Sequence, residues 1–211
     1  RKFNEDVKNT AHTTFSKDGK RIYYTICDYK ENAEIRCQLY YREKDKRKRW
    51  GKAVKISEDA NLTDFTSTHP NIGTDEKTGN EILYFVSNRP GGKGELDIWY
   101  CNVLQKGKFS APINFEKINT SENDITPFYQ ESTKTLFFSS EGYKGMGGYD
   151  IYKTIKEGEE WTEAAHTGYP LNSSYNDVYF SISQDSSLAY FSSNRLGSMY
   201  LDETNKSCCN D

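Results

Sequence analysis

A short run of aromatic residues recurs along this chain at a nearly constant interval. The four copies centre on Tyr24, Phe85, Phe138 and Phe191, and serines follow the last three of them. The centres lie 61, 53 and 53 residues apart. A regular interval of this length is the signature of a repeat protein in which each copy is one supersecondary unit. We therefore expect the chain to fold as a series of similar units.

A second element keeps the same phase as the first. The segment Glu95–Tyr100 recurs as Gly148–Lys153, and Cys37–Tyr41 takes its place in the first unit. Each copy is followed by a segment that begins at an aromatic residue: Trp50, Phe109 and Trp161. Each unit thus supplies an inner strand, an aromatic strand, a third strand and an outer strand. Four antiparallel strands in a unit of this length are typical of one blade of a β-propeller.

The repeat predicts an all-β fold, a β-propeller of four-stranded antiparallel blades. Residues 1–211 would form a single propeller domain, with units at about 9–61, 62–119, 120–172 and 173–211, the last of them incomplete. Radial closure protects the edge strands of a propeller, and a closed ring commonly has more than four blades. We therefore expect a fragment, about four blades of a larger ring.

Glycine-rich turns precede the third strand in two units. Gly91–Gly94 stands before Asp97, and Gly145–Gly148 stands before Asp150. Aspartate side chains commonly accept hydrogen bonds from the backbone N–H groups of such turns. Because both units use the same residue at the same turn, we interpret Asp97 and Asp150 as structural rather than catalytic.

Charge and hydropathy exclude two classes of protein. The net charge is −3, with 28 basic and 31 acidic residues, so the clustered positive surface that nucleic acids require is not expected. The one basic run, Arg42–Arg49, is interpreted as a solvated hairpin tip. No stretch approaches the roughly 18 apolar residues of a membrane span. Only 35% of residues are hydrophobic, yet 16 Tyr and 11 Phe argue against disorder.

Cys27 and Cys37 flank a predicted hairpin loop. Antiparallel strands would bring them opposite each other, and a disulfide there would imply an oxidising compartment. The alternative, two reduced and half-buried thiols, stays open at this point. The cysteine and histidine spacings do not match a zinc site.

His12 and His69 occupy the same position of the repeat, and Thr126 takes that position in the third unit. The inner strands of a propeller converge on its central channel, so these two histidines are candidate ligands for a metal or an anion. The alternative is a position whose side chain bonds neighbouring backbone. Because further ligands are not evident, we expect no metal and no cofactor. The acidic segment Asp75–Glu81 lacks the full ligand series of a calcium loop.

Several phrases resemble TolB-type propeller repeats, and in particular the propeller region of OmpA-family envelope lipoproteins of Bacteroidetes. They are Phe15–Tyr24, Ile82–Gly94, Ile125–Tyr129, Phe191–Arg195 and Cys208–Asp211. In that group a tetratricopeptide region precedes the propeller and a peptidoglycan-binding domain follows it, and some members accompany the type IX secretion and gliding machinery. The resemblance implies a periplasmic, outer-membrane-associated protein that contacts peptidoglycan only through a domain outside this chain. None of the family's lipid-anchor or peptidoglycan-binding residues has a counterpart among the 211 positions of this sequence.

The function predicted from these features is a non-enzymatic scaffold that binds other proteins of the cell envelope or of a secretion complex. No catalytic residue is predicted, because nucleophile motifs of the Gly-x-Ser-x-Gly kind are absent. Trp50, Trp99 and Trp161 are expected as wedges between blades, or else as anchors for a partner. The alternative function is a glycan-binding or glycan-cleaving propeller, since the many acidic residues could include a catalytic carboxylate pair.

Overall fold

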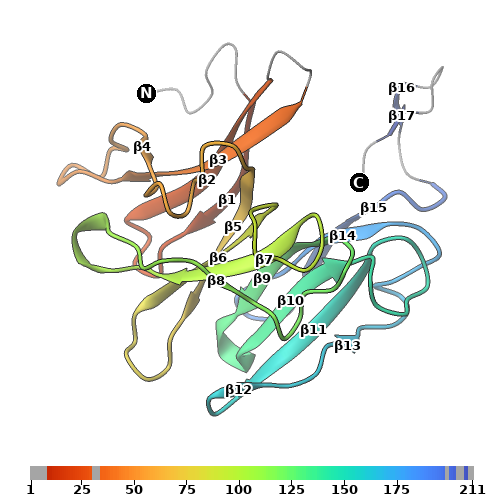
Figure 1. Ribbon diagram of the computed structural model, residues 1–211. Helices are drawn as coiled ribbons and strands as arrows, with labels where there is room; N and C mark the ends of the chain where they lie inside the picture. Colours follow the sequence, from red (N-terminus) through yellow and green to blue (C-terminus); the bar gives the residue numbers. More distant parts are fainter. Residues whose placement is uncertain (1–8, 30–33, 198–199, 203–206, 209–211) are drawn as a thin grey trace.

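The computed structural model describes residues 9–29, 34–197, 200–202 and 207–208, which form small antiparallel sheets gathered around a common centre (Figure 1). No α-helix occurs within these residues; the only helical segments there are two short 3₁₀ turns, η1 (Gln105–Gly107) and η2 (Glu131–Thr133). The end of the phrase Cys208–Asp211, from residue 209 onward, lies outside the described residues.

The strands group into blades in chain order. The first blade has the strand order β1 (Asn9–Phe15), β2 (Arg21–Tyr29), β3 (Ile35–Glu43), β4 (Val54–Lys55). The second has β5 (Ser67–Thr74), β6 (Glu81–Ser87), β7 (Asp97–Asn102), β8 (Ile113–Asn114). The third has β9 (Asp124–Gln130), β10 (Thr135–Ser140), β11 (Asp150–Glu157), β12 (Glu160–Trp161) and β13 (Ala165–His166). The fourth pairs β14 (Asp177–Ile182) with β15 (Ala189–Ser193), and β16 (Tyr200–Asp202) pairs with β17 (Ser207–Cys208).

The first strands of successive blades lie side by side. Strand β1 contacts β5, β5 contacts β9, and β9 contacts β14, so these four strands surround the centre of the molecule. All strand pairs within the blades are antiparallel. This arrangement confirms the predicted fold class, a partial propeller of antiparallel blades.

The second strands of the first three blades, β2, β6 and β10, are deeply buried, whereas β15 of the fourth blade is largely exposed or half-buried. Large side chains fill the interfaces between blades, as expected when aromatic residues supply most of the apolar area. Trp99 belongs to the cluster between the first two blades, and Trp161 packs on Phe115 across the next interface with ring centroids 5.2 Å apart. Trp99 and Trp161 are therefore wedges between blades. Trp50 instead packs on Phe15, 6.2 Å away, within the first blade.

The outer strands are shorter than the sequence suggested. Strands β4 and β8 have two residues each, and the aromatics Trp50 and Phe109 precede them as isolated bridges. Two-residue outer strands leave few unpaired N–H and C=O groups at the rim, which limits edge-to-edge association.

A buried asparagine holds the third strand of each complete blade. Asn119 accepts a hydrogen bond from the Ile98 N–H (2.9 Å) and donates one to the Ile98 carbonyl (2.9 Å). Asn61 does the same to Leu39, and Asn172 does the same to Ile151. Each amide thus bonds both backbone groups of one strand residue where the short outer strand has ended. The buried N–H has its partner in the asparagine, whereas the carbonyl also accepts an N–H from the chain that follows the outer strand, as Ile98 does from Phe115 (3.0 Å).

The glycine-rich turns fold over their aspartates. The Asp97 carboxylate accepts hydrogen bonds from the N–H groups of Lys93 (3.0 Å) and Gly94. Asp150 accepts the equivalent bonds from Met146 (2.6 Å) and Gly147. The carboxylate lies so close to the turn that a Cβ at Gly92 or Gly145 would collide with it. Both aspartates therefore have a structural role in these turns.

Cys27 and Cys37 face each other in the register of β2 and β3 and are joined by a disulfide. Cys101 is a free, buried cysteine. The disulfide closes a short loop, so it restricts the unfolded chain less than a long-range bond would.

We predict that reduction, or the double change Cys27→Ser and Cys37→Ser, lowers the free energy of unfolding by about 2 kcal/mol, the low end of the usual range for a disulfide. Denaturant titration with and without dithiothreitol measures this. The double variant should respond no further to reductant, whereas a wild-type transition unchanged by dithiothreitol would show that the bond is absent in solution.

Candidate functional site: an axial pocket

The four inner strands share one irregularity at the centre of the ring. Each has a register shift at the same point, and the residue at each shift has a positive φ: His12 (50°), His69 (48°), Thr126 (53°) and Tyr179 (58°). This region of backbone space is unfavourable for side chains with a Cβ, and most of all for a β-branched one such as threonine. The bulges turn these four side chains toward the axis.

Three of these side chains form one hydrogen-bonded group. The Tyr179 hydroxyl lies 3.0 Å from His12 Nε2 and 3.2 Å from His69 Nε2. The two imidazole rings stand edge to face with centroids 4.2 Å apart, and Tyr179 stacks on His12 at 5.4 Å. A Thr68 hydroxyl lies 3.3 Å from His12 Nδ1. Side chains from three blades are thus fixed against one another.

Both imidazoles are neutral at physiological pH. Burial lowers the pKa of His12 to about 4, and burial together with the nearby His12 lowers the pKa of His69 well below its ordinary value. A hydroxyl has one proton, so Tyr179 donates to one Nε2 and accepts an N–H from the other, which two neutral imidazoles allow. His69 Nδ1 is buried and has no hydrogen-bond partner within the described residues.

A cavity of about 120 Å³ adjoins this group. Its remaining walls come from the residues that follow each bulge: Thr13, Pro70, Asn71, Pro127, Phe128 and Phe180. The walls therefore combine aromatic faces with imidazole, hydroxyl and amide groups and include no carboxylate. Concave sites of this kind, mostly apolar with a few fixed polar groups, bind small organic ligands.

The sequence located part of this pocket. It placed His12, His69 and Thr126 at one repeat position near the channel, and the structure brings the two histidines into contact. It missed Tyr179, which lies 53 residues after Thr126 and could have been found by extending the repeat into the fourth unit. Within the described part of the chain, no group of three or more His, Cys, Asp or Glu side chains is arranged to hold a metal ion.

The acidic segment Asp75–Glu81 forms an ordinary turn. Asp75 Oδ1 accepts hydrogen bonds from the N–H groups of Lys77 (2.9 Å) and Thr78 (3.0 Å). The same bonds lower the pKa of Asp75. Its carboxylate is thus used within the turn.

Comparison with solved structures identifies enzymes that share this fold. The α-L-arabinofuranosidase from Lactobacillus brevis superimposes with a TM-score of 0.57 at 13% identity, over 86% of this chain and 63% of that one. A thermostable family-43 glycoside hydrolase gives 0.52 at 15% identity, over 86% and 63%. A puromycin-hydrolyzing peptidase from Mycobacterium tuberculosis gives 0.51 at 14%, over 89% and 28%. The chain therefore covers less than two thirds of each of these proteins.

These likenesses show the fold, and they correct one prediction. The sequence predicted a chain that is not an enzyme. The comparisons contradict that prediction, because the three structures described above, two glycoside hydrolases and a peptidase, are enzymes that share the fold. At 13–15% identity the comparisons show no particular activity for this chain.

The predicted place in the cell is not tested by these comparisons. No family model and no curated protein matches the sequence. The resemblance to TolB-type and OmpA-family envelope proteins, and the partners it implies, stay predictions. Among the described residues, no helix has the length and apolar character needed to cross a membrane.

Proposed function

We propose that this propeller acts on carbohydrate and binds a sugar chain at the axial pocket. The observation that carries the proposal is the group formed by His12, His69 and Tyr179 beside Phe128 and Phe180. Sugars present apolar ring faces and many hydroxyl groups. Aromatic faces suit the former, and the Thr13 hydroxyl and Asn71 amide in the lining suit the latter.

The rigidity of the pocket supports this proposal. Its polar groups are held by one another and by strained backbone at four equivalent positions, so little side-chain entropy remains to be lost when a ligand binds. Two of the three solved structures described above are glycoside hydrolases, which is consistent with a carbohydrate ligand for this fold.

Cleavage of a glycosidic bond requires two carboxylates on either side of it. The described residues that line the pocket include none, so binding is the step that these side chains perform. Hydrolysis by the whole protein would need acids from outside this lining.

The proposal is tested by titrating the protein with neutral arabino- and xylo-oligosaccharides in a calorimeter. We expect saturable binding that Tyr179→Ala weakens at least about tenfold, a change of about 1.4 kcal/mol in binding free energy. Tyr179 is 40% exposed, so the variant should fold, and circular dichroism checks this.

Tyr169→Ala is the matched control, because Tyr169 is 80% exposed and does not line the pocket. It should bind like the wild type. A chromogenic arabinofuranoside assayed in parallel reports cleavage. If neither oligosaccharide binds, or if the Tyr179 variant binds as tightly as the wild type, the pocket is not a sugar site.

We also propose that the protein works in an oxidising compartment such as the periplasm. The Cys27–Cys37 disulfide supports this, since such bonds persist in secreted and periplasmic proteins and are rare in the cytosol.

A further inference from the structure

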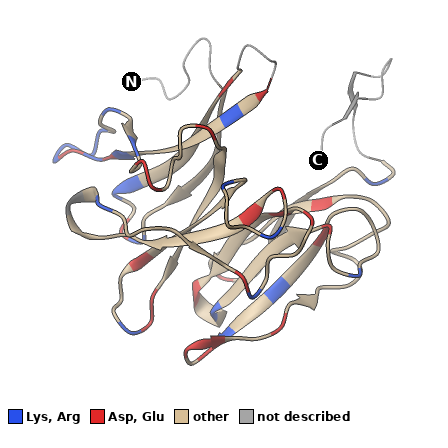
Figure 2. Ribbon diagram, in the orientation of Figure 1, with Lys and Arg blue, Asp and Glu red and all other residues tan. Residues whose placement is uncertain are grey.

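Positive charge gathers at the hairpin tips of the first blade. Figure 2 shows Lys and Arg concentrated where the β3–β4 hairpin projects from the body, on the left of the view. The basic residues of the β1–β2 turn and of this hairpin are Lys17, Lys20, Lys44, Lys46, Arg47, Lys48, Arg49 and Lys52, with Asp18 and Asp45 as the acids between them. This local excess of six positive charges contrasts with a chain whose net charge is −3.

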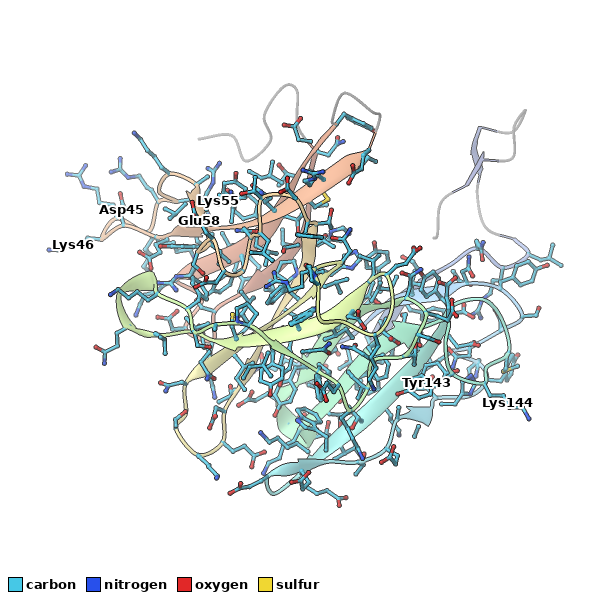
Figure 3. The ribbon with its side chains drawn as sticks, viewed as in Figure 1. Asp45, Lys46, Lys55, Glu58, Tyr143 and Lys144 are labelled. Carbon is cyan, nitrogen blue, oxygen red and sulfur yellow. A yellow bond between two sulfur atoms is a disulfide. The ribbon has the colours of Figure 1, made fainter. Side chains whose placement is uncertain are left out.

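The two turns enclose a groove of about 580 Å³. We call it the basic groove; its walls are Asp18, Gly19, Lys20, Lys44, Asp45, Lys46 and Lys48. Asp45 and Lys46 stand at the outer tip of the hairpin, with their side chains directed away from the blade (Figure 3). The groove is therefore open to a large ligand.

Both acids of the groove are already used within their own turns. Asp18 accepts hydrogen bonds from Ser16 Oγ (2.8 Å) and the Lys20 N–H (2.9 Å). Asp45 accepts bonds from the N–H groups of Arg47 (2.8 Å) and Arg49 (2.9 Å) and from the Arg49 guanidinium. These bonds lower the pKa of Asp18 to about 2 and also lower the pKa of Asp45.

Three cations remain for a ligand. Within the described residues, Lys46, Arg47 and Lys48 form no ion pair. Lys48 has a φ of 58°, a conformation in which a glycine would be less strained. The β3–β4 turn thus has a lysine at a position where the backbone conformation favours glycine.

Aromatic rings lie next to this charge. Lys44 donates a hydrogen bond to the Gly19 carbonyl (2.9 Å), and its ammonium lies 4.7 Å from the Trp50 ring centroid. Phe15, packed on Trp50, is 53% exposed. Exposed aromatic surface beside fixed and unpaired cations suits a ligand with apolar ring faces and carboxylates.

The basic groove and the axial pocket are connected by one strand. Strand β1 runs from His12 past Thr13, which lines the pocket, to Phe15, and then enters the turn that lines the groove. Three residues of extended strand span roughly 10 Å. The same strand therefore leads from the lining of the pocket into the turn that lines the groove.

We propose that the basic groove binds the carboxylates of an acidic polysaccharide, a uronate-bearing chain whose neighbouring sugars occupy the axial pocket. The choice of a sugar polymer rests on the proposed function. Lysines provide the charge that carboxylates require, and Phe15 and Trp50 provide a face for sugar rings.

The test compares tetragalacturonate with a neutral arabino-oligosaccharide in the calorimeter. We expect the triple change Lys44→Gln, Lys46→Gln, Lys48→Gln to weaken tetragalacturonate binding at least about tenfold and to leave the neutral ligand unaffected. Raising NaCl from low to high concentration should weaken only the acidic ligand, because salt screens exposed charges. The control triple Lys93→Gln, Lys117→Gln, Lys144→Gln removes the same charge from exposed positions of the second and third blades and should bind both ligands normally.

The outcomes separate this inference from the proposed function. If neither tetragalacturonate nor the neutral oligosaccharide binds, the groove inference and the proposed function both fail. Two results would overturn the groove inference while leaving the axial pocket as a sugar site. In the first, the neutral sugar binds and tetragalacturonate binds no more tightly than it does. In the second, the variant with Lys44, Lys46 and Lys48 changed to Gln binds tetragalacturonate as the wild type does. Single-stranded DNA or anionic vesicles that bind through the same lysines more tightly than tetragalacturonate would also overturn the groove inference.

Discussion

Replacing Asn119 by alanine should lower the free energy of unfolding by about 2 kcal/mol, because the buried Ile98 N–H loses its partner, at a cost of about 1–3 kcal/mol. The Ile98 carbonyl keeps the hydrogen bond that it accepts from the Phe115 N–H (3.0 Å). Asn119 is 4% exposed and bonds both polar groups of Ile98 as well as Asn114 Oδ1 (2.6 Å). Urea titration followed by tryptophan fluorescence measures the loss. Ile98 is fully buried, so no water can replace the amide.

Asn80→Ala is the matched control for this experiment. Asn80 lies exposed in the turn before β6, and its replacement should change the free energy of unfolding by less than about 0.5 kcal/mol, as surface substitutions do. Should Asn119→Ala fail to fold, hydrogen exchange of the Ile98 amide in the wild type tests the same bond. Rapid exchange of that amide, or equal losses from the two variants, would refute the role given to Asn119.

The architecture could be predicted from the sequence because one signal was repeated several times. The aromatic strands around Tyr24, Phe85 and Phe138 are buried on both faces, so their apolar runs stand out from polar surroundings. The turn aspartates Asp97 and Asp150 could be predicted for the same reason, since each follows a glycine-rich segment in the same phase.

The buried asparagines that bond the third strands were not predicted, although they recur about as regularly as the aromatic strands. Asn61, Asn119 and Asn172 each stand alone among loop residues, where asparagine is common for local turn geometry. Only the three-dimensional fold shows that each amide reaches a strand 21 or 22 residues earlier in the chain. Single polar residues that satisfy distant backbone groups leave no periodic pattern to read.

The axial pocket was predicted only in part because its members differ in kind. His12 and His69 could be paired as like residues at like positions, whereas Tyr179 shares the position without sharing the chemistry. The basic groove was interpreted as a solvated tip, since the sequence could not show that Asp45 bonds its own turn and leaves the cations beside it unneutralised.

A buried carboxyl in the third blade lacks the arginine that its counterparts have. In the fourth blade, Arg195 donates to Asp177 Oδ1 (2.5 Å), and in the second, Arg89 donates to Ser67 (3.1 Å) at the corresponding place. In the third blade, Ser139 and Ser140 are followed by Glu141 and Gly142, so a glycine stands where the fourth blade has Arg195. Tyr143, labelled in Figure 3, donates to the Ile118 carbonyl (2.9 Å) but leaves Asp124 without a cation.

Burial consequently raises the pKa of Asp124 to about 6, although hydrogen bonds from Ser140 and Thr120 oppose the shift. The nearby charge of Asp97 raises the pKa further. A folded-state pKa above the ordinary 3.8 means that the folded protein favours the protonated acid. The stabilisation is therefore complete below about pH 4 and is lost as the pH rises through 6.

We predict that Asp124→Asn removes this pH dependence. The difference in free energy of unfolding, variant minus wild type, should increase by about 3 kcal/mol from pH 4 to pH 7, since one pKa unit corresponds to about 1.4 kcal/mol. Burial lowers the pKa of both His12 and His69, which gives a pH dependence of the opposite sign, but both proteins contain these residues, so their effect cancels in the difference. Asp185→Asn is the control: hydrogen bonds lower the pKa of Asp185 to about 2, so this group is ionised in both the folded and the unfolded protein above pH 4, and the difference for this variant should stay nearly constant over the interval. A difference for Asp124→Asn that is flat with pH would mean that Asp124 is ionised throughout and is neutralised by a cation in solution.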